Sequence, residues 1–165
     1  MNLLCAPVEY GFYDIKFETL DGIQVKTSAY HGKKVIVAVV SADSSNLTLV
    51  RYLDSVQKVN SGVQVIAIPT GDFNGNIDVQ DLKNIRKKLS ILVTKPLRVK
   101  KSSASLQHPL FNWLTQAKEN KHFDMDVEGE GQVFVISTKG TLYSVLPKNT
   151  PKAVIGKIIN KSFNE

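Results

Sequence analysis

The fold of this chain is decided by one stretch, Val35-Ile36-Val37-Ala38-Val39-Val40, an unbroken apolar run in which most side chains are β-branched. A strand that is buried on one face alternates apolar and polar side chains. An unbroken apolar run is instead typical of a strand that is covered on both faces. We therefore predict a central strand over residues 33–42.

The residues that follow predict a strand–helix–strand unit and then a second helix. Apolar residues recur at the spacing of one helix face, after three candidate N-caps: Leu49, Val50, Leu53 and Val56, preceded by Ser44, Ser45 and Asn46. Residues 63–68 repeat the buried-strand pattern, which stops at Pro69. A second apolar stripe, with Asp78 placed as its N-cap, predicts the next helix: Val79, Leu82, Ile85 and Leu89.

The remaining patterns predict a hairpin at each end of this unit and two further helices. Residues 13–18 and 23–27 flank Asp21-Gly22, which favours a β-turn, and residues 132–137 and 141–146 form a late hairpin. Proline opens both later helices, the first with its apolar face on Leu110, Phe111, Leu114 and Ala117 and the last after Thr150-Pro151. We predict an α/β, thioredoxin-like fold: a mixed central sheet flanked by helices, with an N-terminal β-hairpin.

Length and composition indicate one globular domain. The chain has 165 residues, of which 42% are hydrophobic and 22% charged, so we predict a tail over residues 1–12 and a single domain over 13–165. Cys5 is the only cysteine, which excludes an intrachain disulfide and a Cys-x-x-Cys site. No apolar run reaches the roughly 18 residues that span a bilayer. The sequence favours the cytoplasm, with an export or lipoprotein signal in residues 1–7 as the open alternative.

Positive charge is concentrated between residues 83 and 118, a stretch without any acidic residue. It holds nine of the 21 Lys and Arg residues of a chain whose net charge is +6. A local positive field attracts anions, so we predict an anionic small molecule or an acidic protein as partner, rather than nucleic acid. The alternative is a solvated helix face and loop. The predicted binding residues are Lys83, Arg86, Lys87, Lys88, Lys95, Arg98, Lys100 and Lys101.

Several segments resemble the glutathione peroxidase family, in the order in which that family has them. The most specific is His108-Pro109-Leu110-Phe111-Asn112-Trp113-Leu114. Others are similar to the family's hairpin, its entry into the central strand, its loop after the next strand and its last hairpin: residues 17–22, 30–35, 68–75, and 134–136 with 139–140. The resemblance runs over about residues 13–159. It implies a thioredoxin-like fold and, for relatives, reduction of hydroperoxides with glutathione or thioredoxin.

The resemblance also implies where the family's catalytic residues fall, and every one of these positions differs here. The reactive cysteine or selenocysteine falls on Ser44, the glutamine on Asp72, and the tryptophan and asparagine on Gly129 and Glu130. A serine hydroxyl stays protonated and has no counterpart to the reversible oxidation of sulfur. Asp72 would raise the pKa of a neighbouring thiol instead of lowering it. We therefore predict an inactive relative that binds a partner.

Two enzymatic or structural alternatives remain for these residues. Ser44 has a simpler interpretation as a helix N-cap, because serine oxygens accept hydrogen bonds from unpaired backbone N–H groups. A residual or altered redox enzyme would instead have to use Cys5.

Metal binding and self-association are further alternatives, and no cofactor is predicted. Residues 72–78 carry oxygen side chains at alternate positions, as calcium loops do, but Ile77 and Lys83 occupy the places of the required glycine and glutamate. Four acidic residues alternate along one segment, which we call the acidic strip: Asp124, Asp126, Glu128 and Glu130. Its first three members are weak candidates for binding calcium or magnesium. This acidic strip could also contact the basic stretch of a second copy, giving a homo-oligomer.

Overall fold

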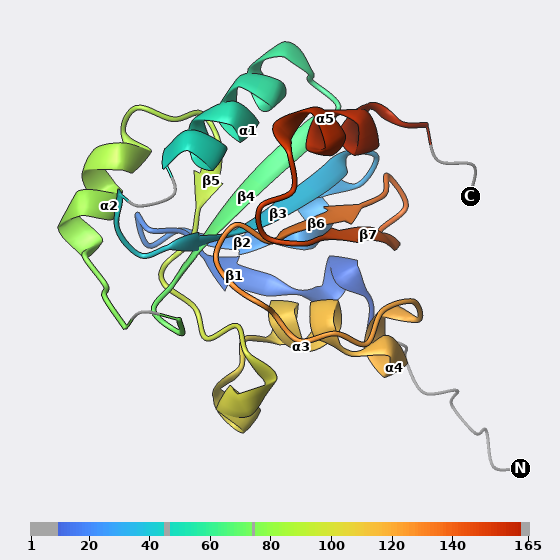
Figure 1. The fold of residues 1–165 in the computed structure, drawn as a ribbon. Helices are drawn as coiled ribbons and strands as arrows, with labels where there is room; N and C mark the ends of the chain where they lie inside the picture. The colour runs from blue at the N-terminus through green and yellow to red at the C-terminus, as the bar shows by residue number, and fades with distance from the viewer. Residues whose placement is uncertain (1–9, 45–46, 74, 163–165) are drawn as a thin grey trace, which may run out of the picture.

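The predicted central strand lies in the middle of the sheet. The structure is a computed structural model that describes residues 10–44, 47–73 and 75–162, and within them β3 (Lys34–Ser41) is the third of five strands, in the order β5-β4-β3-β6-β7 (Figure 1). Its side chains alternate between two apolar cores, Ile36, Ala38 and Val40 facing one and Val35, Val37 and Val39 the other. Each is at most 4% exposed, so both faces are covered.

The sheet is mixed, as the sequence predicts. β4 (Val63–Thr70) is parallel to β3, with α1 (Leu47–Val59) between them, and β5 (Leu92–Val93) is parallel to β4 after α2 (Val79–Arg86). β6 (Val133–Ile136) and β7 (Leu142–Leu146) are antiparallel additions on the other side of β3. Asp78 caps α2 by accepting a hydrogen bond from the Asp81 N–H (2.9 Å), as predicted.

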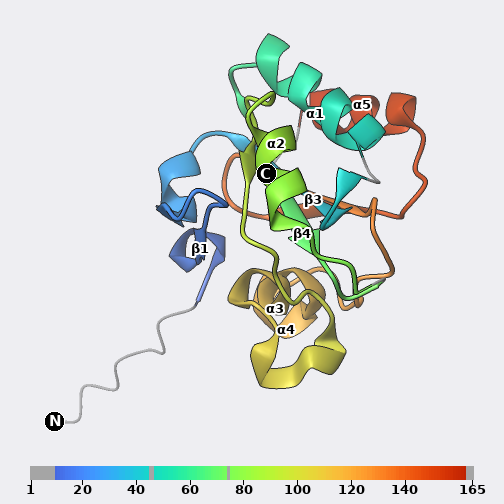
Figure 2. The same cartoon turned by 90° about the vertical axis from the view of Figure 1, so that its left-hand side faces the viewer.

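Helices cover both faces of the sheet. α1, α2 and α5 (Lys152–Asn160) lie on one face, and α3 (Pro109–Thr115) and α4 (Ala117–Asn120) lie on the other (Figure 2). The first layer contributes Leu53, Leu82 and Ile155 to its core, and α3 contributes Leu110 and Phe111 to the second. The arrangement is a thioredoxin-like α/β fold.

The N-terminal hairpin covers one edge of the sheet. β1 (Lys16–Glu18) and β2 (Gln24–Lys26) form a separate antiparallel pair on the side of α3. The hairpin then meets the outer side of β5, where the Leu20 N–H donates to the Val93 carbonyl (2.8 Å) and the Lys95 N–H donates to the Glu18 carbonyl (3.0 Å). These bonds satisfy the edge groups of β5.

Three local details differ from the expectation. β4 continues through Pro69 to Thr70, because the missing N–H of a proline is harmless where the neighbouring strand, β5, has already ended. α3 ends at Thr115, and Ala117 begins a new helix after Gln116 adopts an extended conformation (φ −123°, ψ 117°). The sequence also missed β5 and the short 3₁₀ helices η1 (Phe12–Asp14), η2 (Thr27–Tyr30) and η4 (Lys101–Leu106).

The packed core already includes Phe12, at the last position of the predicted tail. This side chain is 2% exposed, and its ring lies 5.4 Å from that of Trp113. Over the described ranges, no helix is long and apolar enough to cross a membrane.

Candidate functional site

Three segments of the chain meet at one edge of the sheet. Because β3 and β4 are parallel, their last residues, Ser41 and Thr70, lie opposite each other. β6 runs the other way, so its start lies at the same edge, where the Gly131 N–H donates to the Val39 carbonyl (2.7 Å). We call this edge the carboxyl edge. The four positions assigned by the resemblance follow or precede these strand ends by a few residues: Ser44, Asp72, Gly129 and Glu130.

Ser44 and Asp72 reach the carboxyl edge but line different cavities. Ser44 is exposed and lines a groove between α1 and α2. Asp72 lines a separate cavity of about 160 Å³, together with Ile77, Leu97 and Arg98. The position that would cap α1 directly, before Leu47, lies outside the described residues, so the N-cap interpretation of Ser44 stays a prediction. The Cys5 alternative also lies outside the described residues.

Asp72 anchors the loop after β5. Its side chain is 3% exposed, and Oδ1 accepts a hydrogen bond from Arg98 (3.0 Å). Oδ2 accepts the backbone N–H groups of Val99 (2.7 Å) and Lys100 (3.2 Å). Burial by itself would raise the pKa of Asp72, but these hydrogen bonds and the Arg98 charge hold the pKa below its usual value. Asp72 is therefore an ionised, fully engaged carboxylate.

Glu130 feels the charge of Asp43, the residue before Ser44. Burial, and secondly the charge of Asp43, raise the pKa of Glu130. One of its oxygens, Oε1, is buried and has no hydrogen-bond partner among the described residues. Asp43 accepts a hydrogen bond from the Asn76 amide (2.9 Å), which ties the loop after β4 to the end of β3. A carboxylate therefore directly precedes Ser44, while the groove that Ser44 lines also holds Arg51 and Lys88.

Gly129 is buried under a lysine side chain. A Cβ atom at this position would lie 2.9 Å from Cδ of Lys148, closer than real Cβ contacts. The tryptophan that the resemblance implies here could be accommodated only if Lys148 moved. A side chain larger than that of glycine at this position would therefore displace the flexible side chain of Lys148.

The oxygen side chains of the loop after β4 point to separate partners. Asp72 binds the segment 98–100, Asn76 binds Asp43, and Asp78 caps α2. In the part of the chain that the structure describes, no group of three or more His, Cys, Asp or Glu side chains is placed to hold a metal ion. The calcium-like spacing is thus used for hydrogen bonds within the fold.

The acidic strip contacts the basic stretch of its own chain. Nζ of Lys101 lies 2.7 Å from Oδ1 of Asp124, and the Lys101 N–H donates to Oδ1 of Asp126 (2.9 Å). Glu128 is exposed. Of the proposed metal ligands, Asp124 therefore already has a cationic partner, and Asp126 already accepts a backbone N–H group.

Half of the predicted anion-binding residues form ion pairs within the chain. Besides Lys101, these are Arg86 with Asp21 (3.3 Å), Lys95 with Glu18 (2.5 Å) and Arg98 with Asp72 (3.0 Å). The other half forms no ion pair with a described residue: Lys83, Lys87, Lys88 and Lys100. Available positive charge is therefore concentrated at the C-terminal end of α2.

Sequence reasoning missed Asp54, a buried carboxylate on α1. Its side chain is 7% exposed, pairs with Lys58 (2.6 Å), and accepts hydrogen bonds from the Ser90 N–H (2.6 Å) and hydroxyl (2.7 Å). Burial alone would raise the pKa of Asp54, but the bonds from Lys58 and Ser90 lower it. The signal was present in the sequence, since Asp54 adjoins Leu53 on the apolar stripe of α1.

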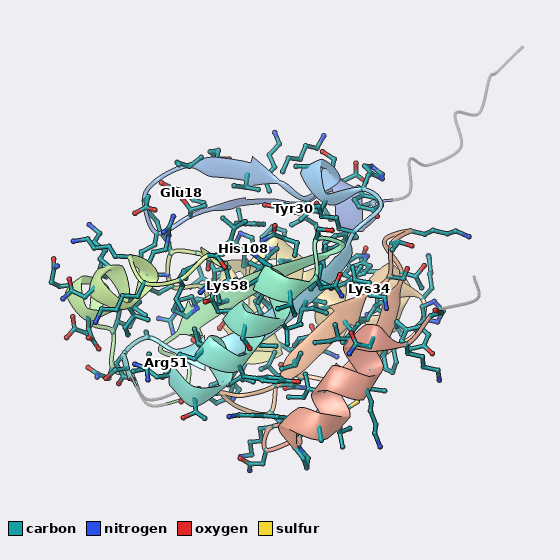
Figure 3. The ribbon with its side chains drawn as sticks, turned by 90° about the horizontal axis from the view of Figure 1, so that it is seen from above. Glu18, Tyr30, Lys34, Arg51, Lys58 and His108 are labelled. Carbon is teal, nitrogen blue, oxygen red and sulfur yellow. The ribbon has the colours of Figure 1, made fainter. Side chains whose placement is uncertain are left out.

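The histidines have positions that do not form a common site with Ser44. His31 stacks on Tyr13, with ring centroids 3.6 Å apart. Nδ1 of His108 accepts the Leu110 N–H (3.1 Å) and so caps α3, and burial lowers the pKa of His108. His108, labelled in Figure 3, is therefore a structural residue of its segment.

Solved structures of other proteins share the fold of this chain. No family model and no curated protein matches this chain. The crystal structure of Trgpx in its apo form has a TM-score of 0.72 at 21% identity, over 91% of this chain and 93% of that one. GPX1 of T. cruzi follows with 0.71 at 16% identity, over 91% and 94%. A thioredoxin-family thiol:disulfide interchange protein from Chlorobium tepidum TLS gives 0.64 at 18% identity, over 94% and 97%. Glutathione peroxidases and thioredoxin-family proteins thus share this fold.

Proposed function

We propose that this chain is a glutathione-peroxidase-like protein that has lost thiol-peroxidase chemistry and acts by binding an anionic partner. The proposal rests on Ser44, which stands at the position that the resemblance assigns to the reactive chalcogen. Peroxide reduction requires a thiolate or selenolate that attacks oxygen and is then regenerated by a thiol. A serine hydroxyl does not ionise at physiological pH and does not enter this oxidation cycle.

The surroundings of Ser44 support loss of the activity rather than a single substitution. Asp43 directly precedes Ser44 and its charge also acts on Glu130; these two carboxylates would each disfavour a thiolate at position 44. Asp72 is committed to Arg98 and the loop behind it. None of these groups is arranged to activate a nucleophile.

The remaining positive charge supports a binding role. Lys83, Lys87 and Lys88 lie exposed on or just after α2 and form no ion pair with a described residue. Uncompensated cations attract anions, and this attraction is weakened by salt. The resulting interaction should therefore be salt-sensitive.

The decisive experiment is a coupled assay of hydroperoxide reduction by the purified, metal-free chain, with glutathione and with thioredoxin as reductant. We expect a rate equal to the rate without protein. Rapid peroxide consumption would overturn the proposal. If that consumption disappeared in Cys5→Ser, the alternative of an enzyme based on Cys5 would be established.

Engineered variants test the surroundings. Ser44→Cys should remain a poor peroxidase, and Ser44→Cys combined with Glu130→Asn should react faster, because the second change removes a charge that opposes the thiolate. Rapid turnover by Ser44→Cys alone would show that the surroundings are still competent.

The metal-binding alternative has its own measurement. Calcium that bound the native chain would raise its melting temperature. We expect no shift with millimolar calcium, since Asp124 and Asp126 contact Lys101. A rise of several degrees would establish the alternative.

A further inference from the structure

A groove with charged walls lies between α1 and α2. Its volume is about 400 Å³. α1 lines it with residues that recur every three or four positions, Leu47, Arg51, Asp54 and Lys58, which is one helix face. Figure 3 labels Arg51 and Lys58 on the side of α1 that faces α2. We call this cavity the α1–α2 groove.

The floor of the α1–α2 groove is apolar. Leu47, Ile85 and Leu89 line it and are only partly buried. The same three side chains border a small adjoining cavity of about 20 Å³, which reaches Val40 and Val93 of the sheet. An apolar group that enters the α1–α2 groove would therefore remove half-exposed side chains from water.

The charged groups that line the α1–α2 groove leave an excess of positive charge. Asp54 is neutralised by Lys58 (2.6 Å) and by the Ser90 donors. Arg51 on α1 and Lys88 beyond the end of α2 are exposed and form no ion pair with a described residue. Asp81 is the remaining carboxylate in the lining. The α1–α2 groove therefore has two cations without an ion pair to a described residue, Arg51 and Lys88, beside its apolar side chains. One carboxylate, that of Asp81, opposes them.

We propose that the α1–α2 groove binds a small amphipathic anion, with its carboxylate or phosphate group at Arg51 and Lys88 and its apolar body on Leu47, Ile85 and Leu89. This inference rests on the proposed binding function and names its ligand class and site. A volume of about 400 Å³ fits a small molecule, since such sites enclose roughly 300–1,000 Å³. Arginine suits this role because its guanidinium binds carboxylates and phosphates through two parallel hydrogen bonds.

The ligand class can be tested with a fluorescent amphipathic anion, 8-anilinonaphthalene-1-sulfonate, titrated into the full chain. Octanoate and octyl phosphate, which share one apolar body, should displace the probe, and the more effective of the two identifies the head group. Inorganic phosphate and 1-octanol each lack one half of the ligand. We expect both to displace the probe at concentrations at least about tenfold higher.

Matched variants test the site. Arg51→Gln with Lys88→Gln should weaken probe binding at least about tenfold, because both cations at the head group are removed. Lys157→Gln with Lys161→Gln makes the same change of net charge on and just after α5, in the same helix layer and outside the lining, and should weaken binding less than about twofold. Asp81→Asn should strengthen binding, because it removes the opposing carboxylate. Circular dichroism confirms that each variant is folded.

Three results would overturn this inference. Equal weakening by the two double variants would show that only the general field attracts the probe. Displacement by 1-octanol as efficient as by octanoate would show that the cations take no part. No binding of the probe to the folded chain would exclude the site. None of these results concerns peroxide turnover, so the loss of catalysis is judged separately by the coupled assay.

Discussion

The two halves of the basic stretch have similar composition but different surroundings. In the half that belongs to α2, Arg86 pairs with Asp21, but Lys83, Lys87 and Lys88 are exposed and form no ion pair with a described residue. In the half that follows β5, Lys95 and Arg98 each pair with a carboxylate of this chain, and Lys101 does the same. The difference teaches that a run of like charges can serve the fold at one end and remain available to a ligand at the other.

Two buried carboxylates hold parts of the basic stretch in place through hydrogen bonds. Asp54 holds the turn after α2 through Ser90, and Asp72 holds residues 98–100. Both are ionised groups in buried positions, with hydrogen bonds that compensate the loss of water. Loss of a buried carboxylate partner should therefore destabilise the chain, whereas loss of the unpaired cations of α2 should not.

Asp72→Asn should have the largest effect on this comparison. The substitution removes the charge that Arg98 and two backbone N–H groups contact, and it presents an amide donor to other donors. We expect the free energy of unfolding to fall by about 3 kcal/mol, measured by urea denaturation. Asp124→Asn is the control, because its carboxylate pairs with Lys101 but is 67% exposed, and it should leave the urea midpoint nearly unchanged. A loss below about 1 kcal/mol for Asp72→Asn would contradict the anchoring role.

Lowering the pH should reveal how much Asp54 and Asp72 stabilise the unmodified chain. The pKa values of Asp54 and Asp72 are lower in the folded state than the usual value of about 3.9. Their stabilising contribution is thus complete above that value and is lost as the pH falls through the lowered pKa values. We expect the free energy of unfolding to decline below about pH 5 and less steeply in Asp54→Asn and Asp72→Asn. Equal slopes in all three proteins would contradict this explanation.

Glu130→Gln should move stability in the opposite direction. Glu130 is a partly buried carboxylate that has Asp43 beside it, and its pKa is raised. The folded state therefore binds its proton more tightly, and ionisation destabilises the fold at neutral pH. Removing the charge should stabilise the chain by about 0.5–1 kcal/mol at pH 7. This gain should vanish as the pH falls through the pKa of Glu130; a gain that persists at pH 3 would mean that charge is not its cause.

Lys95→Gln should have the smallest effect. The side chains of Lys95 and Glu18 are 49% and 36% exposed, although their charged atoms are only 2.5 Å apart. Exposed ion pairs contribute little, so we expect a loss below about 0.5 kcal/mol that disappears in 1 M salt. A loss comparable to that of Asp72→Asn would erase the distinction between exposed and buried partners.

The fold was predictable because its main signals are local. The apolar run of β3 specifies a strand between two layers, and Asp78 marks the start of α2. β5 has only two residues, too few to show a period, and the interruption of α3 at Gln116 depends on packing rather than on a helix-breaking residue. Pro69 misled the prediction because its consequence depends on which neighbour its backbone faces.

The candidate site was predictable only where a motif carried it. The resemblance brings Ser44, Asp72 and Glu130 to one edge, and the parallel pairing of β3 and β4 explains why. The ion pairs were beyond reach, since Lys95 and Glu18 are 77 residues apart in the sequence. The α1–α2 groove was equally inaccessible, because it exists only when two helix faces are placed opposite each other.

The N-terminal hairpin covers the edge of β5 and so limits how copies of this chain could associate strand to strand. With that side occupied by Leu20 and Lys95, the sheet of the described residues has its one remaining outer strand at β7. If two molecules paired along β7, the free edges of both β7 strands would be covered. Pairing through β7 alone would therefore stop at a dimer, because the hairpin segment covers the opposite side of each sheet.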